Sequence, residues 1–437
     1  MNKTEQVLQT IDSMRDELVS LTAELVRIPS VNPRYPGMDY QKEVGGETAC
    51  NQRLAVAYRA AGCTVDFVER EKDRANLVGV LGGSGGGRSL IYNGHIDVVP
   101  VGNAPDWKFG DPFSGKTEDG KLYGRGSCDM KGGVVAQLKG IEALGRCGVA
   151  LKGDVILESV VGEETMSHEV GVSAVCEKYR ADAAIVSEPT APPVDLAVVP
   201  VTPGLLWMTL TCRGKASHAS VRSEMIRSWG LGSEIAVSAI EKGVYLLQAI
   251  CRLEEQWGQS KKHPLFRPGH FSLHPGVITG GPHGVMIPFV ISQFCTIEYS
   301  VWYPPDEPVE DIKREIQDYV AKASQLDPWL QENPPEITFN LHWPPSSIPV
   351  EHPIVQACAA AHRKAMRPRA VDDRELFQGF CAVCDAAFLN LAGIPSVIYG
   401  PGSLLQAHAV DEYVDIDDLV TATKTFAIAA MDWCGWE

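Results

Sequence analysis

The chain has 437 residues, of which 45% are hydrophobic and 22% charged, sufficient for two or three folded domains. Its formal net charge is −16 and no basic block is present, which argues against nucleic acid or an anionic membrane as a partner. No apolar run reaches the roughly 18 residues of a membrane span, no signal peptide is visible, and twelve scattered cysteines fit a reducing compartment, so we expect a cytoplasmic protein.

Strands and helices alternate through the first part of the chain. Helices are predicted from the amino terminus to the prolines of "RIPSVNP", over "ETACNQRLAVAYRAAG", and after the loop that opens "GRGSCDMKGGVVAQLKGIEAL". Buried strands are predicted in "CTVDFVE", "ANLVGVLGG", "SLIYNGHIDVVP", "GDVILESVVGEET" and "ADAAIVSEPT". The glycine-rich "GGSGGGR" lacks the residues of a phosphate-binding loop and is predicted to be a turn. This alternation indicates an α/β domain with a parallel or mixed sheet.

The pattern changes at about residue 201. A half-exposed strand in "LLWMTLTCRG" precedes a long helix around "SEIAVSAIEKGVYLLQAICRLEEQW", two strands, a helix over "EPVEDIKREIQDYVAKAS" and a strand in "EITFNLHWP". The order β-α-β-β-α-β is typical of a ferredoxin-like sandwich. The α/β pattern resumes after "PPSSIPVEHP". We therefore predict a discontinuous α/β domain of residues 1–200 and 348–437, with an α+β domain of residues 201–347 inserted into it.

Candidate metal ligands follow the predicted strands. In "GHIDVV", His95 and Asp97 lie on the same side of a strand, so Asp97 could brace the His95 ring. Each candidate alone is weak, since a lone histidine is usually structural and a glutamate pair is usually solvated. Loops of one α/β domain can converge at one sheet edge, however, and a mixed nitrogen and oxygen set suits zinc and tolerates cobalt or manganese. The remaining candidates are Asp129, Glu163, Glu164, Glu188 and His408.

Six blocks of the sequence, spread over roughly residues 10 to 430, occur together in a fixed order. They read "GHIDVVP", "LYGRGSCDMKGG", "VVGEET", "SEPT", "GKASHAS" and "GIPSVIYGPGSLLQAHAVDEYV". As a set they resemble the signature blocks of a dinuclear metallopeptidase and deacylase family. That family includes acetylornithine deacetylase, succinyl-diaminopimelate desuccinylase, the aminoacylases, carnosinases and glutamate carboxypeptidase. The resemblance implies an α/β catalytic domain of the zinc-peptidase type, with a ferredoxin-like lid and dimerisation domain inserted into it.

The resemblance also implies a role for each candidate. Two divalent ions, with zinc favoured, would be held by a shared set of ligands, and a carboxylate beside them would act as general base on a water. His95 and Glu188 would complete the first metal, Glu164 and His408 the second, Asp129 would bridge both, Asp97 would orient His95, and Glu163 would be the base.

His218, in "GKASHAS", lies in the predicted inserted domain. The resemblance implies a homodimer built on that domain, in which His218 reaches the partner's active site and stabilises an oxyanion. The alternative is a histidine that caps the start of a helix. About seventeen residues, within "MIRSWGLGSEIAVSAIEKG", are extra relative to shorter family members. They could reshape the substrate entrance or only lengthen a helix.

Two positions depart from the family where an Asn and an Arg usually grip a substrate carboxylate. Here Val285 and Trp302 stand at about those places. An indole cannot replace a bidentate guanidinium, so Trp302 could stack on an aromatic group or simply pack in the sheet. Arg374 is a candidate substitute cation, and Gly402 is a further candidate for substrate binding. The "CAVC" motif is expected to pack within a helix rather than bind zinc or undergo redox chemistry.

The sequence thus predicts a metal-dependent hydrolase that cleaves an amide C–N bond of a small N-acyl amino acid, dipeptide or related N-acyl compound. Peptidase, N-deacylase and N-carbamoyl hydrolase activities remain open at this point. The loss of the carboxylate grip at Trp302 motivates the alternative of a non-peptide or aromatic C–N bond. The hypothesis from a different class is an inactive homologue that binds a small molecule, which predicts a missing ligand or base; none is missing.

Overall fold

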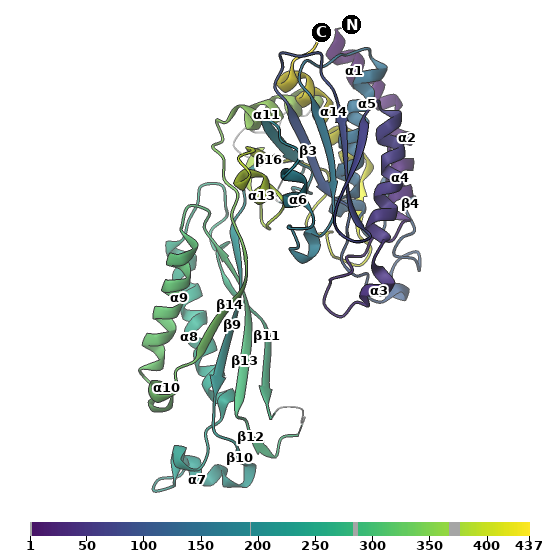
Figure 1. Ribbon diagram of the computed structural model, residues 1–437. Coiled ribbons are helices and arrows are strands. Elements are labelled where there is room, and N and C mark those ends of the chain that lie inside the picture. Colours follow the sequence, from purple (N-terminus) through teal and green to yellow (C-terminus); the bar gives the residue numbers. More distant parts are fainter. Residues whose placement is uncertain (1, 193, 283–286, 367–375) are drawn as a thin grey trace. The chain divides into compact units, whose positions relative to one another are not determined.

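The chain folds into two compact units (Figure 1). The computed structural model describes residues 2–192, 194–282, 287–366 and 376–437. The first unit comprises Met1–Thr202, Ser346–Phe380 and Cys384–Glu437, and the second comprises Pro203–Pro345 and Cys381–Val383. The predicted class, a mixed-sheet α/β domain combined with an α+β domain inserted into its sequence, is confirmed.

An eight-stranded mixed sheet forms the centre of the first unit, in the order β1-β2-β6-β3-β7-β16-β8-β15. The four neighbours β6, β3, β7 and β16 run parallel to one another, so their carboxyl ends lie at the same edge. The sheet strands are β1 (Thr64–Glu71), β2 (Arg74–Leu81), β3 (Leu90–His95), β6 (Val155–Val160), β7 (Ala183–Val186), β8 (Val198–Val201), β15 (Phe377–Gly379) and β16 (Ser396–Ile398). A second, three-stranded sheet contains β4 (Lys116–Glu118), β5 (Lys121–Tyr123) and β17 (Tyr413–Asp415).

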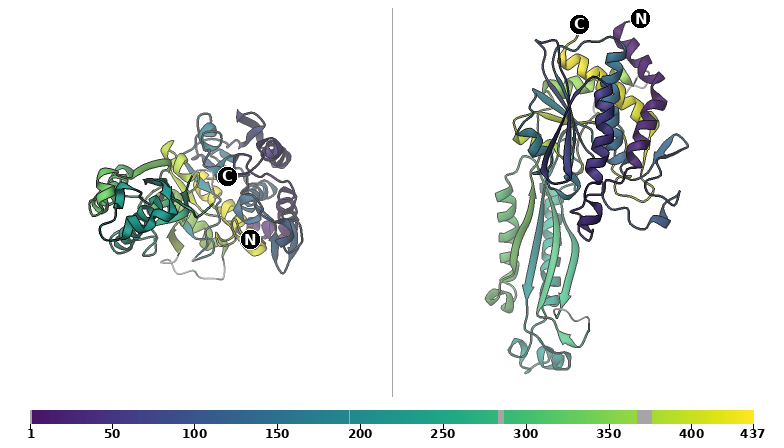
Figure 2. Two further views of the ribbon diagram at one scale, coloured as in Figure 1. Left: turned by 90° about the horizontal axis from the view of Figure 1, so that it is seen from below. Right: turned by 45° about the vertical axis from the view of Figure 1, so that its right-hand side comes forward.

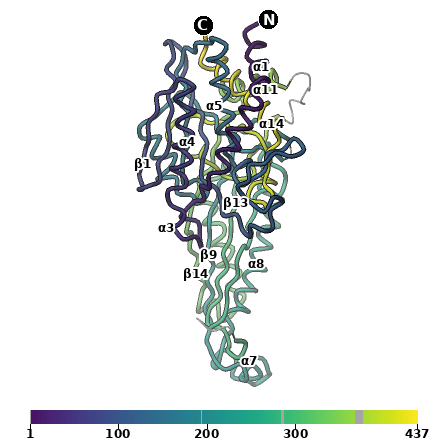
Figure 3. The backbone as a smooth tube through the Cα atoms, turned by 90° about the vertical axis from the view of Figure 1, so that its right-hand side faces the viewer, coloured from purple at the N-terminus to yellow at the C-terminus, as the bar shows by residue number. Residues whose placement is uncertain are grey.

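Helices lie on both sides of the large sheet (Figure 1), which explains why every residue of β3 and β6 is buried and why these strands read as continuous apolar runs. The predicted amino-terminal helix is interrupted at Met14 and forms two helices. In Figures 2 and 3 both termini of the chain lie at one end of this unit. Its helices are α1 (Lys3–Ser13), α2 (Arg15–Val26), α3 (Tyr40–Glu43), α4 (Gly46–Ala60), η1 (Ala104–Asp106), η2 (Ser127–Lys131), α5 (Gly132–Arg146), η3 (Glu163–Thr165), α6 (Val172–Cys176), α11 (Pro353–Ala365), α13 (Ala386–Leu391) and α14 (Ile416–Cys434).

The second unit is an antiparallel sheet of four strands, ordered β11-β13-β9-β14, with two long helices packed on one face. Its chain order β9-α8-β11-β13-α9-β14 is ferredoxin-like, as predicted, and Figure 3 follows β9, β13 and β14 along the unit. The principal elements are β9 (Gly204–Arg213), α8 (Ala239–Ser260), β11 (Leu273–Gly281), β13 (Phe294–Tyr303), α9 (Val309–Ser324), α10 (Pro328–Glu332) and β14 (Glu336–Trp343).

Two local predictions are wrong. The long helix α8 begins only at Ala239, because Ser238 caps it by accepting the Glu241 N–H; the preceding extra residues form short elements instead. The extra residues contribute the end of α7 (Arg222–Ile226) and η5 (Gly232–Glu234). Two short elements precede them, namely β10 (Ser217–His218), which pairs with β12 (Val290–Ile291), and η4 (Ala219–Val221).

The "CAVC" motif lies in an irregular segment before α13, not within a helix. Cys381 is exposed and Cys384 is buried. None of the described helices combines the length and the apolar character needed to cross a membrane.

Candidate metal centre

The candidate ligands of the first unit gather where its four parallel strands end. Because β6, β3, β7 and β16 are adjacent and parallel, residues that follow them meet at one edge of the sheet. In strand order the candidates are Glu163 and Glu164 after β6, His95 at the end of β3, Glu188 after β7 and His408 in the loop after β16, with Asp129 contributed by η2.

The Asp129 carboxylate lies between the two histidines. Its Oδ1 is 3.1 Å from His95 Nε2 and its Oδ2 is 3.4 Å from His408 Nε2. On the His95 side, Glu188 Oε1 lies 3.7 Å from Nε2; on the other side, Glu164 Oε2 lies 3.0 Å from His408 Nε2. The distances therefore divide the ligand atoms into two groups that share one carboxylate.

The donor set fits divalent metal ions. Ligand atoms of His95, Asp129 and Glu164 lie within 4.8 Å of one another, and Glu164 Oε1 is buried without a hydrogen-bond partner. Buried carboxylates this close together repel unless a cation compensates them. Two imidazole nitrogens and several carboxylate oxygens are typical zinc ligands.

The protonation equilibria of the metal-free site reflect the same crowding. Burial raises the pKa of Glu163 and of Glu188 well above the ordinary value, and neighbouring carboxylates add to both shifts while His95 opposes them. Against burial, hydrogen bonds to Asp129 and Glu164 raise the pKa of His408 to about 11. Without cations, the site would therefore hold protons that metal ions replace.

Asp97 contacts the candidate ligands and their loops through both its backbone carbonyl and its carboxylate. The Asp97 carbonyl, 2.9 Å away, accepts from His95 Nδ1, whereas the nearer carboxylate oxygen is 3.8 Å away. This bond occupies Nδ1, so Nε2 of His95 is the nitrogen that faces Asp129 and Glu188. The Asp97 carboxylate instead accepts the backbone N–H groups of Glu163 and Glu164, at 3.4 and 3.1 Å, and the Asn32 amide at 2.8 Å.

A buried ion pair of Arg125 and Glu412, which the sequence did not predict, contacts the backbone of Asp129. Glu412 accepts an Arg125 guanidinium hydrogen bond at 2.6 Å and also the backbone N–H of Asp129 at 3.1 Å. Arg125 and Glu412 are 287 positions apart, and the only sequence signal for Glu412 is the "DE" that follows His408. Gly402, proposed for substrate binding, has a φ of +96° and packs on Cys128, so its lack of a side chain has a local packing reason.

Two further candidates belong to the second unit and are described within it. His218 is exposed, and its Nδ1 accepts the Ser220 N–H at 3.1 Å, capping η4. Trp302 is half-buried on β13, on the face of the sheet opposite α8 and α9, and its ring centroid lies 6.5 Å from that of His270. Val285 and Arg374 lie outside the described residues.

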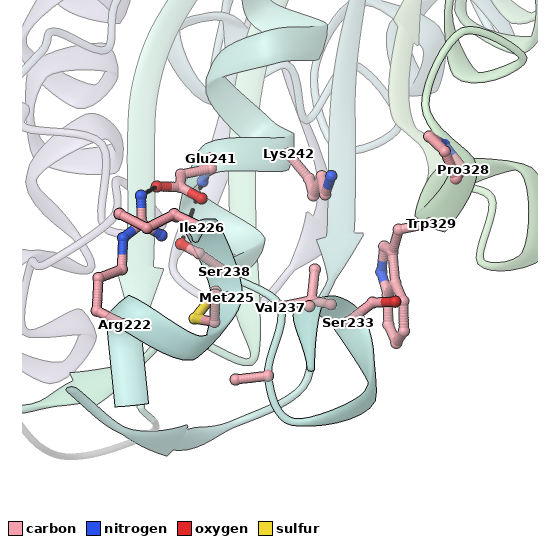
Figure 4. A pocket seen from close by; sticks show the side chains of 12 residues that line it. Arg222, Met225, Ile226, Ser233, Val237, Ser238, Glu241, Lys242, Pro328 and Trp329 are labelled. Carbon is pink, nitrogen blue, oxygen red and sulfur yellow. Dashed lines mark hydrogen bonds and ion pairs between the residues drawn. The ribbon is translucent and has the colours of Figure 1, made fainter. Parts of the chain in front are cut away.

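The extra residues after His218 form a pocket of about 270 Å³ with the start of α8 and with α10 (Figure 4). Arg222 of α7 forms an ion pair with Glu241 of α8 across one side of it, and Trp329 lines another side. In this pocket the segment does not lengthen α8 but builds a separate wall beside its first turn.

A mixed α/β sheet whose edge gathers two histidines and several carboxylates is typical of metal-dependent hydrolases. The profile of Peptidase family M20/M25/M40 matches residues 91–432, and the chain belongs to this family. It is 33% identical to N-formyl-4-amino-5-aminomethyl-2-methylpyrimidine deformylase of Halalkalibacterium halodurans over 98% of this chain and 97% of that protein. The deformylase of the same name from Bacillus subtilis is 34% identical, over 85% of this chain and 86% of that protein.

Solved structures support the fold. Human carnosine dipeptidase 1 matches with a TM-score of 0.66 and 18% identity, covering 99% of both chains. The predicted family and enzyme class are confirmed: the protein is a metal-dependent hydrolase that cleaves an amide C–N bond of a small N-acyl compound.

Proposed function

We propose that the protein is a dinuclear amidohydrolase that removes a formyl or similarly small acyl group from an aminomethyl nitrogen on a heteroaromatic ring. The observation that carries the dinuclear assignment is the Asp129 carboxylate, whose two oxygens face His95 and His408 separately. The substrate class rests on the two deformylase relatives, which are named for an N-formyl aminomethylpyrimidine. Zinc is the favoured metal because the set combines imidazole with carboxylate; cobalt and manganese also suit it.

The first group of ligands would be His95, Glu188 and Asp129, and the second Glu164, His408 and Asp129. When bound, the two ions would supply Lewis acidity and lower the pKa of a water to about 7.

Glu163 would carry protons in the reaction. Its Oε2 lies 4.0 Å from His95 Nε2, beside the ligand cluster, and its side chain is 11% exposed. Glu163 would take a proton from the attacking water and deliver it to the departing nitrogen, so that one water and one formamide give formate and the free amine. Its backbone N–H is held by Asp97, which keeps the base beside its neighbour Glu164.

Trp302 supports a planar, uncharged leaving group. Where many family members are expected to carry a carboxylate-gripping arginine, this chain presents an indole on the helix-free face of the sheet. An indole can stack on a heteroaromatic ring but offers no cation to a carboxylate. Trp302 is therefore assigned to the ring of the substrate.

We further propose a homodimer formed through the second unit, with His218 acting on the partner's substrate. Since Nδ1 of His218 accepts the Ser220 N–H, the neutral ring carries its proton on Nε2, and an Nε2–H donor suits an oxyanion. Mixing inactive Glu163→Gln and His218→Ala proteins tests this arrangement. Recovery of activity in the mixture is expected, and persistent inactivity of verified mixed dimers would contradict action in trans.

A substrate panel tests the function itself. The zinc-loaded protein is assayed on an N-formyl aminomethylpyrimidine, its N-acetyl analogue, N-acetyl amino acids and dipeptides. We expect kcat/KM to be highest for the formyl heteroaromatic compound. Preference for N-acetyl amino acids would instead identify an amino-acid deacylase and remove the assignment of Trp302, whereas inactivity on every amide would refute the proposal.

A further inference from the structure

We propose that the buried ion pair of Glu412 and Arg125 is a positioning device that sets the second metal group by fixing both the Asp129 loop and the His408 backbone. The inference rests on the proposed dinuclear function. Both side chains are almost completely buried, with Glu412 at 0% and Arg125 at 3% exposed, so solvent screens their interaction little.

One oxygen of Glu412 holds the backbone of the loop that carries Asp129. Its Oε1 accepts the N–H groups of Gly126, Cys128 and Asp129 at 2.9, 3.0 and 3.1 Å. Asp129 has φ −119° and ψ 94°, which are not helical values, and a charged acceptor provides a strong bond for its N–H. The carboxylate therefore determines where the backbone of Asp129 lies.

The other oxygen of Glu412 accepts Arg125 Nη1 at 2.6 Å, and the same guanidinium reaches the His408 loop. Arg125 Nη2 donates to the His408 carbonyl at 3.2 Å. His408 has a φ of +62°, in the left-handed region that residues other than glycine rarely adopt. The His408 side chain is 54% exposed and contacts Asp129 and Glu164 through Nε2, while the bond from Arg125 restrains the backbone of the same residue.

The contacts of this pair are one-sided. Glu412 and Arg125 bond to the backbone of Asp129 and His408, but among the described residues neither bonds to His95 or Glu188. Loss of the pair should therefore weaken the second metal group, which contains His408, more than the first. Partners that orient metal ligands typically contribute about 10- to 100-fold in metal affinity.

The test is cobalt titration of the folded protein, followed by visible absorption and by competition with a chelator. Glu412→Gln keeps the size and one acceptor oxygen but removes the charge. Arg125→Lys keeps the charge but replaces the planar fork, so one ammonium cannot span Glu412 and the His408 carbonyl in the same geometry. We expect both variants to bind the second Co²⁺ about 10- to 100-fold more weakly and to change its absorption bands, while the first Co²⁺, which shares only Asp129 with the second group, loses clearly less affinity.

The matched control is Glu47→Gln, which disrupts the equally buried Glu47–Arg74 pair of α4 and β2. It should lower the thermal stability without altering either cobalt affinity. If Glu412→Gln does not fold, Arg125→Lys carries the test, because it retains the charge balance.

Wild-type affinity and spectrum for both ions in the folded variants would overturn the positioning role. A wild-type protein that binds only one Co²⁺ would instead contradict the proposed dinuclear function, and the two failures are therefore distinguishable.

Discussion

Replacing Glu163 and, separately, its neighbour Glu164 by glutamine tests whether Glu163 is the general base and Glu164 a metal ligand. The two substitutions are chemically identical, occur in the same short helix η3, and leave intact the backbone N–H groups that donate to Asp97. Glu163 Oε2 stands 4.0 Å from His95 Nε2, whereas Glu164 Oε2 stands 3.0 Å from His408 Nε2 and belongs to the ligand cluster. We therefore expect opposite phenotypes from adjacent residues.

Glu163→Gln should keep both metal ions and lose turnover. A positioned general base contributes roughly 10²- to 10⁴-fold, and at about 1.36 kcal/mol per tenfold this raises the barrier by about 3 to 5 kcal/mol. Glu164→Gln should bind one ion about as wild type and the second much more weakly, and excess zinc should restore part of its activity.

The assay combines kcat on the formyl heteroaromatic substrate with metal analysis after gel filtration. The reasoning is refuted if Glu163→Gln retains more than a tenth of the wild-type kcat or loses a metal ion that Glu164→Gln keeps.

Three other outcomes are expected. Burial raises the pKa of Glu158 from 4.5 to about 8, so ionisation of this carboxyl destabilises the fold as the pH rises through that window. In urea unfolding, Glu158→Gln should be more stable than wild type by up to about 5 kcal/mol near pH 9 and little different near pH 5. Parallel curves of stability against pH for the two proteins would contradict this. Trp302→Arg should raise KM for the heteroaromatic amide about 2- to 10-fold with kcat nearly unchanged, and an unchanged KM would show that the indole only packs in the sheet. Chelation should lower the unfolding midpoint, and zinc at about 100 times its Kd should restore about 3 kcal/mol per site; equal midpoints with and without metal would count against a bound ion.

The strand-end residues could be predicted from the sequence because their placement follows from topology. Apolar runs mark buried strands, and parallel neighbours end at one edge, so His95, Glu164 and Glu188 were expected to meet before any distance was known. The interruption at Met14 and the late start of α8 at Ala239 could not be read in the same way. Both are decided by capping and packing that a hydrophobic pattern does not resolve.

The supporting contacts were beyond the sequence for a different reason. Arg125 and Glu412 are 287 positions apart, and each alone resembles an ordinary charged residue in a loop. Only the fold shows that they are buried together and that their bonds end on the backbone of ligand-bearing loops. Predicting such a pair requires knowing which residues are close in space, whereas the candidate ligands can be predicted from their positions at the ends of strands.

Asp97 shows how the backbone and the side chain of one residue can serve two roles at once. The spacing "HID" predicted a carboxylate that braces the His95 ring, but the His95 Nδ1 contact is made by the Asp97 carbonyl, which leaves the carboxylate available. That carboxylate accepts the N–H groups of both Glu163 and Glu164. The Asp97 carboxylate therefore ties the end of β3 to the loop after β6 and restrains the backbone of Glu163 and Glu164 relative to that of His95. With both backbones restrained in this way, the two adjacent side chains make different contacts: Glu164 Oε2 lies 3.0 Å from His408 Nε2, whereas Glu163 Oε2 lies 4.0 Å from His95 Nε2.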